Sequence, residues 1–169
     1  TSYNGNTVNN IARLNSDGTF DTTFNTGSGA NNSVERAVVQ SDGKIIIVGT
    51  FQIFNGSTRN RIARLNSDGS LDTTFNPGSG ANDSIINVAI QTDNKIIITG
   101  AFVMYNGTSV GRIARLNSDA SIDTTFNTGV GFNTFPGRIL IQPDGKIIIV
   151  GLFSTFNNIA TVPNIIRLN

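Results

Sequence analysis

Short apolar runs, each bounded by polar turn residues, recur along the whole chain. The strongest follow a lysine, as KIIIVG at residues 44–49, KIIITG at residues 95–100 and KIIIVG at residues 146–151. Runs of this length that are apolar on both faces predict strands covered on two sides. No stretch keeps a 3.6-residue period, and turn residues come too often for helices. The pattern therefore predicts an all-β chain.

These predicted strands recur at a fixed interval. IARLN begins at residues 11, 62 and 113, and IIRLN begins at residue 165, which gives spacings of 51, 51 and 52 residues. A period near 50 is typical of a propeller blade or a solenoid unit. We expect repeat units at residues 11–61, 62–112 and 113–164, then a final strand at residues 165–169, all within a single region spanning residues 1–169.

Each unit carries signals for four strands. They are first seen together at residues 34–40, 44–51, 61–66 and 70–75, and the two tight connections each contain an Asp-Gly pair. Asp-Gly favours a hairpin turn because glycine accepts a positive φ angle. Asn94 replaces the glycine of the first turn and is tolerated there, whereas Ala120 in the second turn would cost about 1 kcal/mol in the same conformation. Four antiparallel strands per unit predict three β-propeller-type blades that form part of a larger propeller.

Three blades are too few to close a ring, because propellers need about four or more. The chain begins with Thr1 rather than Met, and its repeats run into both ends without a polar cap. We therefore expect a fragment of a longer chain, whose open edges meet other blades of the same parent chain or a second copy in a homo-oligomer. A stacked β-solenoid is the competing architecture, although its rungs are usually shorter and its strands parallel.

The middle unit contains a set of short motifs spread over its whole length. They are Arg64-Leu65-Asn66, Asp68-Gly69, Asp72-x-x-Phe75-Asn76, Gln91, Lys95, Gly100, Phe102 and Asn106-Gly107. The unit resembles the delta-60 repeat, a family assigned to β-propeller-like domains of unknown function, and similar elements recur in the outer units. The resemblance implies a β-propeller fold and arrays of repeats in large secreted or surface-displayed bacterial proteins. It brings no catalytic residues, because the family has no agreed chemistry.

Composition argues against several classes of function. The net charge is +1, charged residues make up 14% of the chain and no run of like charges occurs, so nucleic acid is not an expected partner. No apolar run approaches the length of a membrane span, so we expect no membrane insertion. Cysteine and histidine are absent, which removes disulfides, thiolate zinc sites and the commonest acid–base side chain. We expect no enzyme activity and no cofactor.

The acidic residues are themselves periodic. Nine of the eleven occupy three repeated positions, Asp17/Asp68/Asp119, Asp21/Asp72/Asp123 and Asp42/Asp93/Asp144. A catalytic pair of carboxylates is needed only once in a protein, whereas contacts that stabilise a blade recur in every blade. The periodicity of the aspartates therefore favours structural roles, in turns and in ion pairs with the equally periodic Arg13, Arg64 and Arg115. Calcium is the competing hypothesis for the Asn-Ser-Asp-Gly phrase, but the spacing lacks the alternating acids of a calcium loop. We expect no metal site.

Two groups of residues remain candidates for a site. The Asp-Thr-Thr phrase is similar to the acceptor of O-linked glycans in some bacterial secreted proteins, which makes Thr22, Thr73 and Thr124 candidate modification sites. A hydroxyl that bonds the backbone at a strand end is the alternative role. Phe132 and Phe135 have no aromatic counterpart in the other units and are candidates for contact with a ligand or partner, or for local repacking.

These observations lead to one expectation about function and one alternative. We expect a non-enzymatic structural or adhesive β-propeller module, located outside the cell or on the bacterial cell surface. The alternative is a carbohydrate- or ligand-binding, lectin-like propeller with sites in the loops between strands. Surface glycans and other proteins are therefore candidate partners, beside further blades of the same kind.

Overall fold

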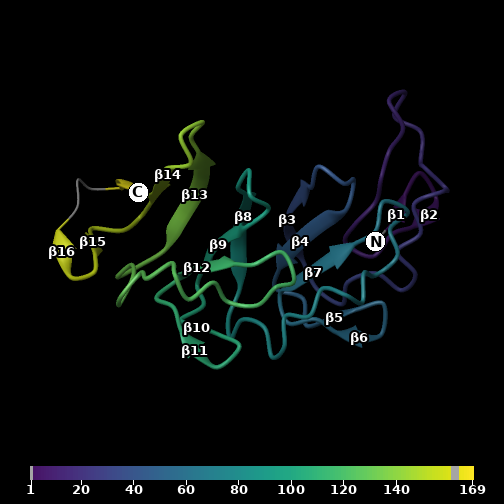
Figure 1. The fold of residues 1–169 in the computed structure, drawn as a ribbon. Helices are drawn as coiled ribbons and strands as arrows, with labels where there is room; N and C mark the ends of the chain where they lie inside the picture. Colours follow the sequence, from purple (N-terminus) through teal and green to yellow (C-terminus); the bar gives the residue numbers. More distant parts are fainter. Residues whose placement is uncertain (1, 161–163) are drawn as a thin grey trace.

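The protein is an open row of small antiparallel sheets (Figure 1). The computed structural model describes residues 2–160 and 164–169, and every regular element in these ranges is a β-strand. Three three-stranded sheets follow one another along the row, and two-stranded hairpins flank them. No helix in the described part of the chain is long and apolar enough to cross a bilayer. The all-β class predicted from the sequence is confirmed.

Each three-stranded sheet repeats the same order and register. The first sheet contains β3 (Val34–Val39), β4 (Ile45–Gly49) and β7 (Ile62–Leu65), with β4 in the centre. The equivalent strands of the other two sheets are β8 (Ile85–Ile90), β9 (Ile96–Gly100) and β12 (Ile113–Leu116), then β13 (Pro136–Ile141), β14 (Ile147–Gly151) and β17 (Ile165–Leu168). The central strand pairs with its third strand in one register throughout, so that Ile45 faces Leu65 in the first sheet.

A short hairpin precedes the third-strand position in every repeat. The hairpins are β1 (Ser2–Tyr3) with β2 (Asn6–Thr7), β5 (Ile53–Phe54) with β6 (Ser57–Thr58), β10 (Met104–Tyr105) with β11 (Thr108–Ser109), and β15 (Thr155–Phe156) with β16 (Ile159–Ala160). At the tip of the β5–β6 hairpin an Asn-Gly pair has positive φ at both residues, 45° at Asn55 and 74° at Gly56. Two such residues form the turn whose twist matches a hairpin, so this segment pairs with itself.

The fourth strand predicted for each unit does not extend the sheets. At residues 70–75 only Leu71 forms a bridge, with Leu65, and single bridges take the same place in the neighbouring repeats. The next residue turns the chain, because Asp72 Oδ1 accepts hydrogen bonds from the backbone N of Thr74 (2.9 Å) and from its hydroxyl (2.7 Å). These local bonds replace the ladder of a fourth strand. The sheets are therefore three-stranded, which corrects the expected count of four.

Three apolar clusters join successive units. In β4, Ile47 lies in the first cluster with Phe24, whereas Ile46 and Val48 lie in the second cluster with Phe75. The third cluster repeats the arrangement between the last two sheets. Each internal sheet therefore buries one face against residues that come before it in the chain and the other against the sheet that follows. Burial of one large apolar side chain contributes about 1.5–3 kcal/mol, so these clusters hold the row together.

The tight turns have the predicted backbone. Gly43 has a φ angle of 82° and Asn94 one of 64° in the first turn, and Gly69 has 89° in the second. Ala120 keeps the left-handed conformation with a φ angle of 79°, at a cost of about 1 kcal/mol. Its side chain is buried in the second cluster and its carbonyl accepts the hydroxyl of Tyr105 (3.1 Å), so packing holds the turn despite the strain.

Replacing Gly43 with valine is expected to destabilise the protein by at least about 1 kcal/mol, because a β-branched side chain is penalised at positive φ. Asn94→Gly at the equivalent turn is the matched control and is expected to be neutral or stabilising. Thermal unfolding of both variants measures the difference. Equal melting temperatures for the wild type and Gly43→Val would contradict the assigned turn.

Candidate functional site

One polar network recurs beside the third strand of the sheets. Asp72 Oδ2 accepts hydrogen bonds from Arg64 Nε (2.7 Å) and from Lys44 Nζ (2.8 Å). We call this set of one aspartate, one arginine and one lysine an ion triad, and the second triad consists of Asp123, Arg115 and Lys95. The sequence predicts the arginine–aspartate pairs but not the lysine, which precedes the central strand and lies 28 residues before the aspartate.

The local fold positions the triad across a unit boundary. Arg64 lies on β7 with its guanidinium 4.9 Å from the centre of the Phe75 ring, and Asp72 begins the Asp-Thr-Thr turn. Arg64 also donates from Nη1 to the carbonyl oxygen of Ser118, in the following unit (2.7 Å). The triad therefore ties two strands of one sheet to the next unit. Its residues are engaged in structural contacts.

The triads hold their carboxylates in the charged form. Burial raises the pKa of Asp72, but hydrogen bonds, led by those from Lys44 and Thr74, outweigh burial and keep this pKa well below its usual range. Asp21 has one cationic partner, and the Thr23 hydroxyl is the largest of the interactions that lower its pKa to about 2. Efficient general acids and bases have pKa values near the working pH. These carboxylates are suited to pairing rather than to proton transfer.

The remaining periodic aspartates close turns, as the sequence predicts. In the Asn-Ser-Asp-Gly phrase, Asp68 Oδ1 accepts from the backbone N (2.9 Å) and the hydroxyl (2.7 Å) of Ser70. In the turn before the central strand, Asp42 Oδ1 accepts from the backbone N of Lys44 (3.0 Å). Equivalent bonds form at Asp17, Asp93, Asp119 and Asp144. The two carboxylates of the repeated phrase thus differ in role, since the first shapes a turn and the second enters an ion pair.

A polar cleft of about 510 Å³ opens between turns of adjacent units. Its lining includes serine hydroxyls and the carboxylates of Asp42, Asp93 and Asp119. Gln40 also lines the cleft, and its Oε1 is buried with no hydrogen-bond partner among the described residues. In the described ranges no three acidic residues come together as a metal site would require. The cleft therefore offers separate acceptors for hydroxyl groups.

The structure separates the two phenylalanines predicted as contact residues. Phe132 is buried, with its ring centre 4.6 Å from that of Phe153 and 4.8 Å from that of Phe156. It occupies the place of Ala81 in the preceding unit, so its burial favours local repacking, the alternative role that the sequence left open, over contact with a ligand. Phe135 is 47% exposed and remains a candidate contact.

Both threonines of the Asp-Thr-Thr phrase are exposed, and the hydrogen bond to the aspartate distinguishes the second from the first. In each repeat the second threonine donates its hydroxyl to Oδ1 of the aspartate, over 2.6–2.7 Å. The first threonines, Thr22, Thr73 and Thr124, are exposed. The alternative structural role therefore falls on the second threonine, and glycosylation of the first stays a prediction.

Comparison with known families gives a match over most of the chain. A family model described as "Domain of unknown function (DUF5122) beta-propeller" matches residues 1–24, 40–75, 91–126 and 142–169. The chain belongs to this family. The four matched pieces confirm the resemblance to a β-propeller repeat of unknown function. No curated protein and no solved structure gave a match.

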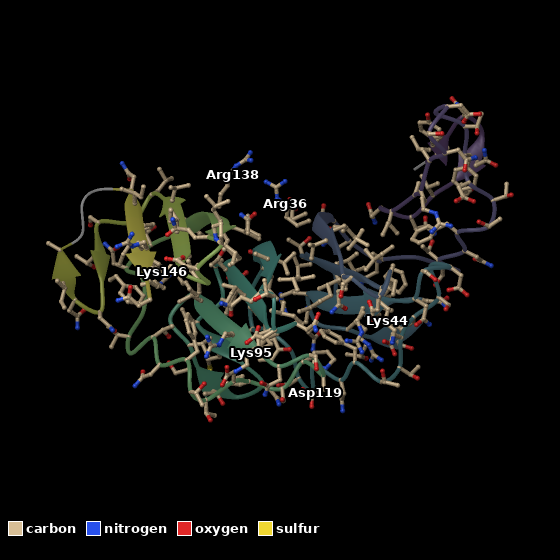
Figure 2. All side chains as sticks on the ribbon, turned by 45° about the horizontal axis from the view of Figure 1, so that its top comes forward. Arg36, Lys44, Lys95, Asp119, Arg138 and Lys146 are labelled. Carbon is tan, nitrogen blue, oxygen red and sulfur yellow. The ribbon has the colours of Figure 1, made fainter. Side chains whose placement is uncertain are left out.

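The DUF5122 matches cover some strands of each sheet and leave others out. The two internal matches run from the turn before the central strand to the Asp-Thr-Thr turn, so each contains a complete ion triad. The first strands β3, β8 and β13 lie outside the matches. On these strands Arg36 and Arg138 occupy equivalent positions, and Figure 2 shows both side chains at an edge of the molecule away from Lys44 and Lys95.

Replacing Asp72 with asparagine is expected to destabilise this DUF5122 protein by about 2 kcal/mol at pH 7, because buried Arg64 and partly buried Lys44 lose their shared counter-ion. The depressed pKa of Asp72 means that its stabilisation is present above about pH 4, the pKa of an unfolded aspartate, and is lost as the pH falls below it. Wild-type stability should therefore fall from about pH 4 towards pH 2, and fall less in the variant. Urea unfolding across this range measures both effects.

Asp68→Asn is the matched control, because Asp68 closes a turn four residues earlier and belongs to no triad. It should lose less stability at pH 7 than Asp72→Asn. Equal losses in the two variants, or an unchanged acid response in Asp72→Asn, would contradict the role assigned to the triad.

Glycosylation at Thr22, Thr73 and Thr124 is expected to raise the intact mass of the natural protein above that of its polypeptide. Thr73→Ala should remove one added mass, because Thr73 is exposed. Thr74→Ala should remove none, because the Thr74 hydroxyl is held by Asp72. Intact-mass spectrometry measures all three proteins, and a native mass equal to that of the bare chain rules the modification out.

Proposed function

We propose that this chain is a non-enzymatic structural module, with an adhesive role, of a secreted or surface-displayed bacterial protein. The ion triad carries the proposal, because the charged residues repeated in the units make contacts within and between units. Repeats joined in this way present a long, regular surface. The proposed location outside the cell rests on the resemblance to delta-60 repeats. The partners that we propose for such a module are surface glycans or other proteins.

The environments of the acidic residues support a role without catalysis. Hydrolysis by a carboxylate pair requires two carboxyl groups at a defined short separation, with one of them able to hold a proton. The periodic aspartates bond to turns or cations. Hydrogen bonds led by those from the Ser70 and Ser121 hydroxyls lower the pKa values of Asp68 and Asp119, which favours the ionised form. Of the two acids outside the period, Asp83 closes a turn by accepting from the backbone N of Ser84 (2.6 Å), and Glu35 lies in a different unit.

A lectin-like function is the second candidate, and the polar cleft favours it. The volume of about 510 Å³ lies within the usual range for small-ligand sites. Asp42, Asp93 and Asp119 line it, and a carboxylate oxygen can accept a hydrogen bond from a sugar hydroxyl.

A glycan-array screen of the full chain distinguishes the two functions. The structural proposal expects no sugar binding that depends on the cleft. Asp93→Asn removes a carboxylate from the cleft, whereas Asp144→Asn changes the equivalent turn of the next unit, whose aspartate does not line it. Binding of one sugar class that is lost in Asp93→Asn and kept in Asp144→Asn would overturn the structural proposal in favour of the lectin.

A further inference from the structure

Two small pockets occur at the same place of the repeat, two repeats apart. The first pocket has a volume of about 230 Å³ and is lined by residues between Thr7 and Gly27. The second pocket has a volume of about 190 Å³ and is lined by residues between Thr108 and Gly129. Each lies where a short hairpin, the sequence of a third strand and an Asp-Thr-Thr turn meet. No residue in the described lining of either pocket belongs to the polar cleft.

Each pocket forms beside a packed neighbouring unit. At the first pocket the neighbour is the following unit, since the backbone N of the lining residue Asn25 donates to the carbonyl oxygen of Asp68 (2.7 Å). At the second pocket the neighbour is the preceding unit, since the lining residue Ala114 belongs to the apolar cluster that contains Ile46. The pocket is therefore present with a neighbour on either side, so it is a property of the repeat itself.

The linings combine apolar surface with hydroxyl groups. In the second pocket Val110, Ile122 and Phe126 supply the apolar surface. Ser109 and Thr124 are exposed and add hydroxyl groups, and neither hydroxyl has a hydrogen-bond partner among the described residues. The equivalent residues of the first pocket are Val8, Phe20, Phe24, Thr7 and Thr22. Both pockets therefore present one kind of surface, apolar on one part and able to form hydrogen bonds on another.

The charges at these pockets leave no counter-ion for a charged ligand. Asp123 and Arg115 line the second pocket, and Asp123 Oδ2 accepts from Arg115 Nε (2.7 Å) and from Lys95 Nζ (2.6 Å) in the ion triad. The described lining of the first pocket contains no charged residue. A ligand that fits both pockets is therefore neutral, because burying an unpaired charge is costly.

The size and the lining together select one class of ligand. An apolar cavity of about 150 Å³ holds one benzene molecule, so volumes of about 190 and 230 Å³ fit one six-membered ring with its substituents. We propose that each pocket binds one neutral pyranose. The C–H groups of the sugar pack on side chains such as Ile122 and Phe126, and its hydroxyls bond to those of Ser109 and Thr124. This inference rests on the adhesive role proposed above and names its ligand class and site.

The middle repeat has bulkier residues at two lining positions. Arg59 takes the place of Val110, and the two side chains leave the backbone at the same point, since Arg59 N donates to Gln52 O (2.7 Å) and Val110 N to Val103 O (3.0 Å). Arg59 Nε is enclosed, with no partner among the described residues, so this side chain lies against the unit. Pro77, which is buried, replaces a threonine at the second position. Arg59 and Pro77 thus fill the space that the pockets leave open, and the chain has two sugar sites in three repeats.

Three equivalent glycine amides test the proposal by NMR. The backbone N of Gly27, Gly78 and Gly129 each donates to an asparagine Oδ1 two residues earlier (2.9, 3.0 and 2.9 Å), so the three amides start from matched environments. Gly27 and Gly129 line the pockets. Titration of the full chain with the methyl pyranosides of glucose, galactose and mannose should shift both amides with at least one sugar. The expected dissociation constant is about 1 mM, as for a small ligand, and Gly78 should not shift.

Variants that exchange residues between repeats give matched controls. Val110→Arg copies the middle repeat and should weaken binding at Gly129 at least about tenfold, because the arginine fills the second pocket. Gly27 of the same chain should still shift, which shows that the variant is folded. Arg59→Val combined with Pro77→Thr makes the reverse change, and sugar should then shift Gly78.

Several results would overturn the proposal. They are no shift of Gly27 or Gly129 with any of the sugars, shifts with phenol but with no sugar, an equal shift of Gly78 in the wild type, and a Gly129 shift that persists in Val110→Arg. Loss of the shifts in Asp93→Asn would assign the sugar to the polar cleft instead. The structural role of the triads is measured by unfolding of Asp72→Asn without sugar. Failure of the pockets and failure of the proposed function are therefore seen in different experiments.

Discussion

The internal sheets of this protein are buried on two faces, and the two faces belong to different neighbours. In β4, Ile47 packs towards the preceding unit and Ile46 towards the following one. The hydrophobic effect stabilises such a sheet only when both neighbours are present, so stability belongs to the row rather than to one unit. The same constraint explains why the central strand is apolar at successive positions, unlike an antiparallel strand with one face in water.

Apolar contact has little direction, and the ion triads supply the direction that it lacks. A carboxylate that accepts from an arginine and a lysine at once permits few alternative arrangements of the three segments that carry them. Arg64 extends this restriction across the boundary through its bond to Ser118. The repeated phrase at residues 66–76 then has a physical explanation, because Asp68 shapes the turn that brings Asp72 to the triad.

Local chemistry made part of this structure predictable. β-branched runs indicated the central strands, and Asp-Gly pairs indicated turns whose positive φ is present at Gly43. The prediction of a fourth strand was wrong because Thr74 forms its hydrogen bonds with Asp72 inside a turn rather than with a neighbouring strand. The alternation of apolar and polar residues at 70–75 does not show that such a turn competes with strand pairing. The sequence did not predict Lys44 as a member of the triad, because Lys44 lies 28 residues before Asp72 and a recurring spacing alone does not show that two side chains are in contact. The cleft depends on turns of adjacent units, so it required the packing of the row.

The first strands of the sheets carry a polar network of their own. β3, β8 and β13 lie outside the pieces that define the family, and at one shared position two arginines flank an amide. Arg36 Nε donates to Asn87 Oδ1 (3.2 Å), and Asn87 Nδ2 donates to the carbonyl oxygen of Gly137 (2.6 Å). An arginine in place of Asn87 would place three positive charges on neighbouring strands. The Asn87 amide instead accepts a hydrogen bond from Arg36, which avoids this repulsion between like charges. The amide of Asn87 therefore links the first strands of three successive sheets and keeps a third positive charge from lying between Arg36 and Arg138.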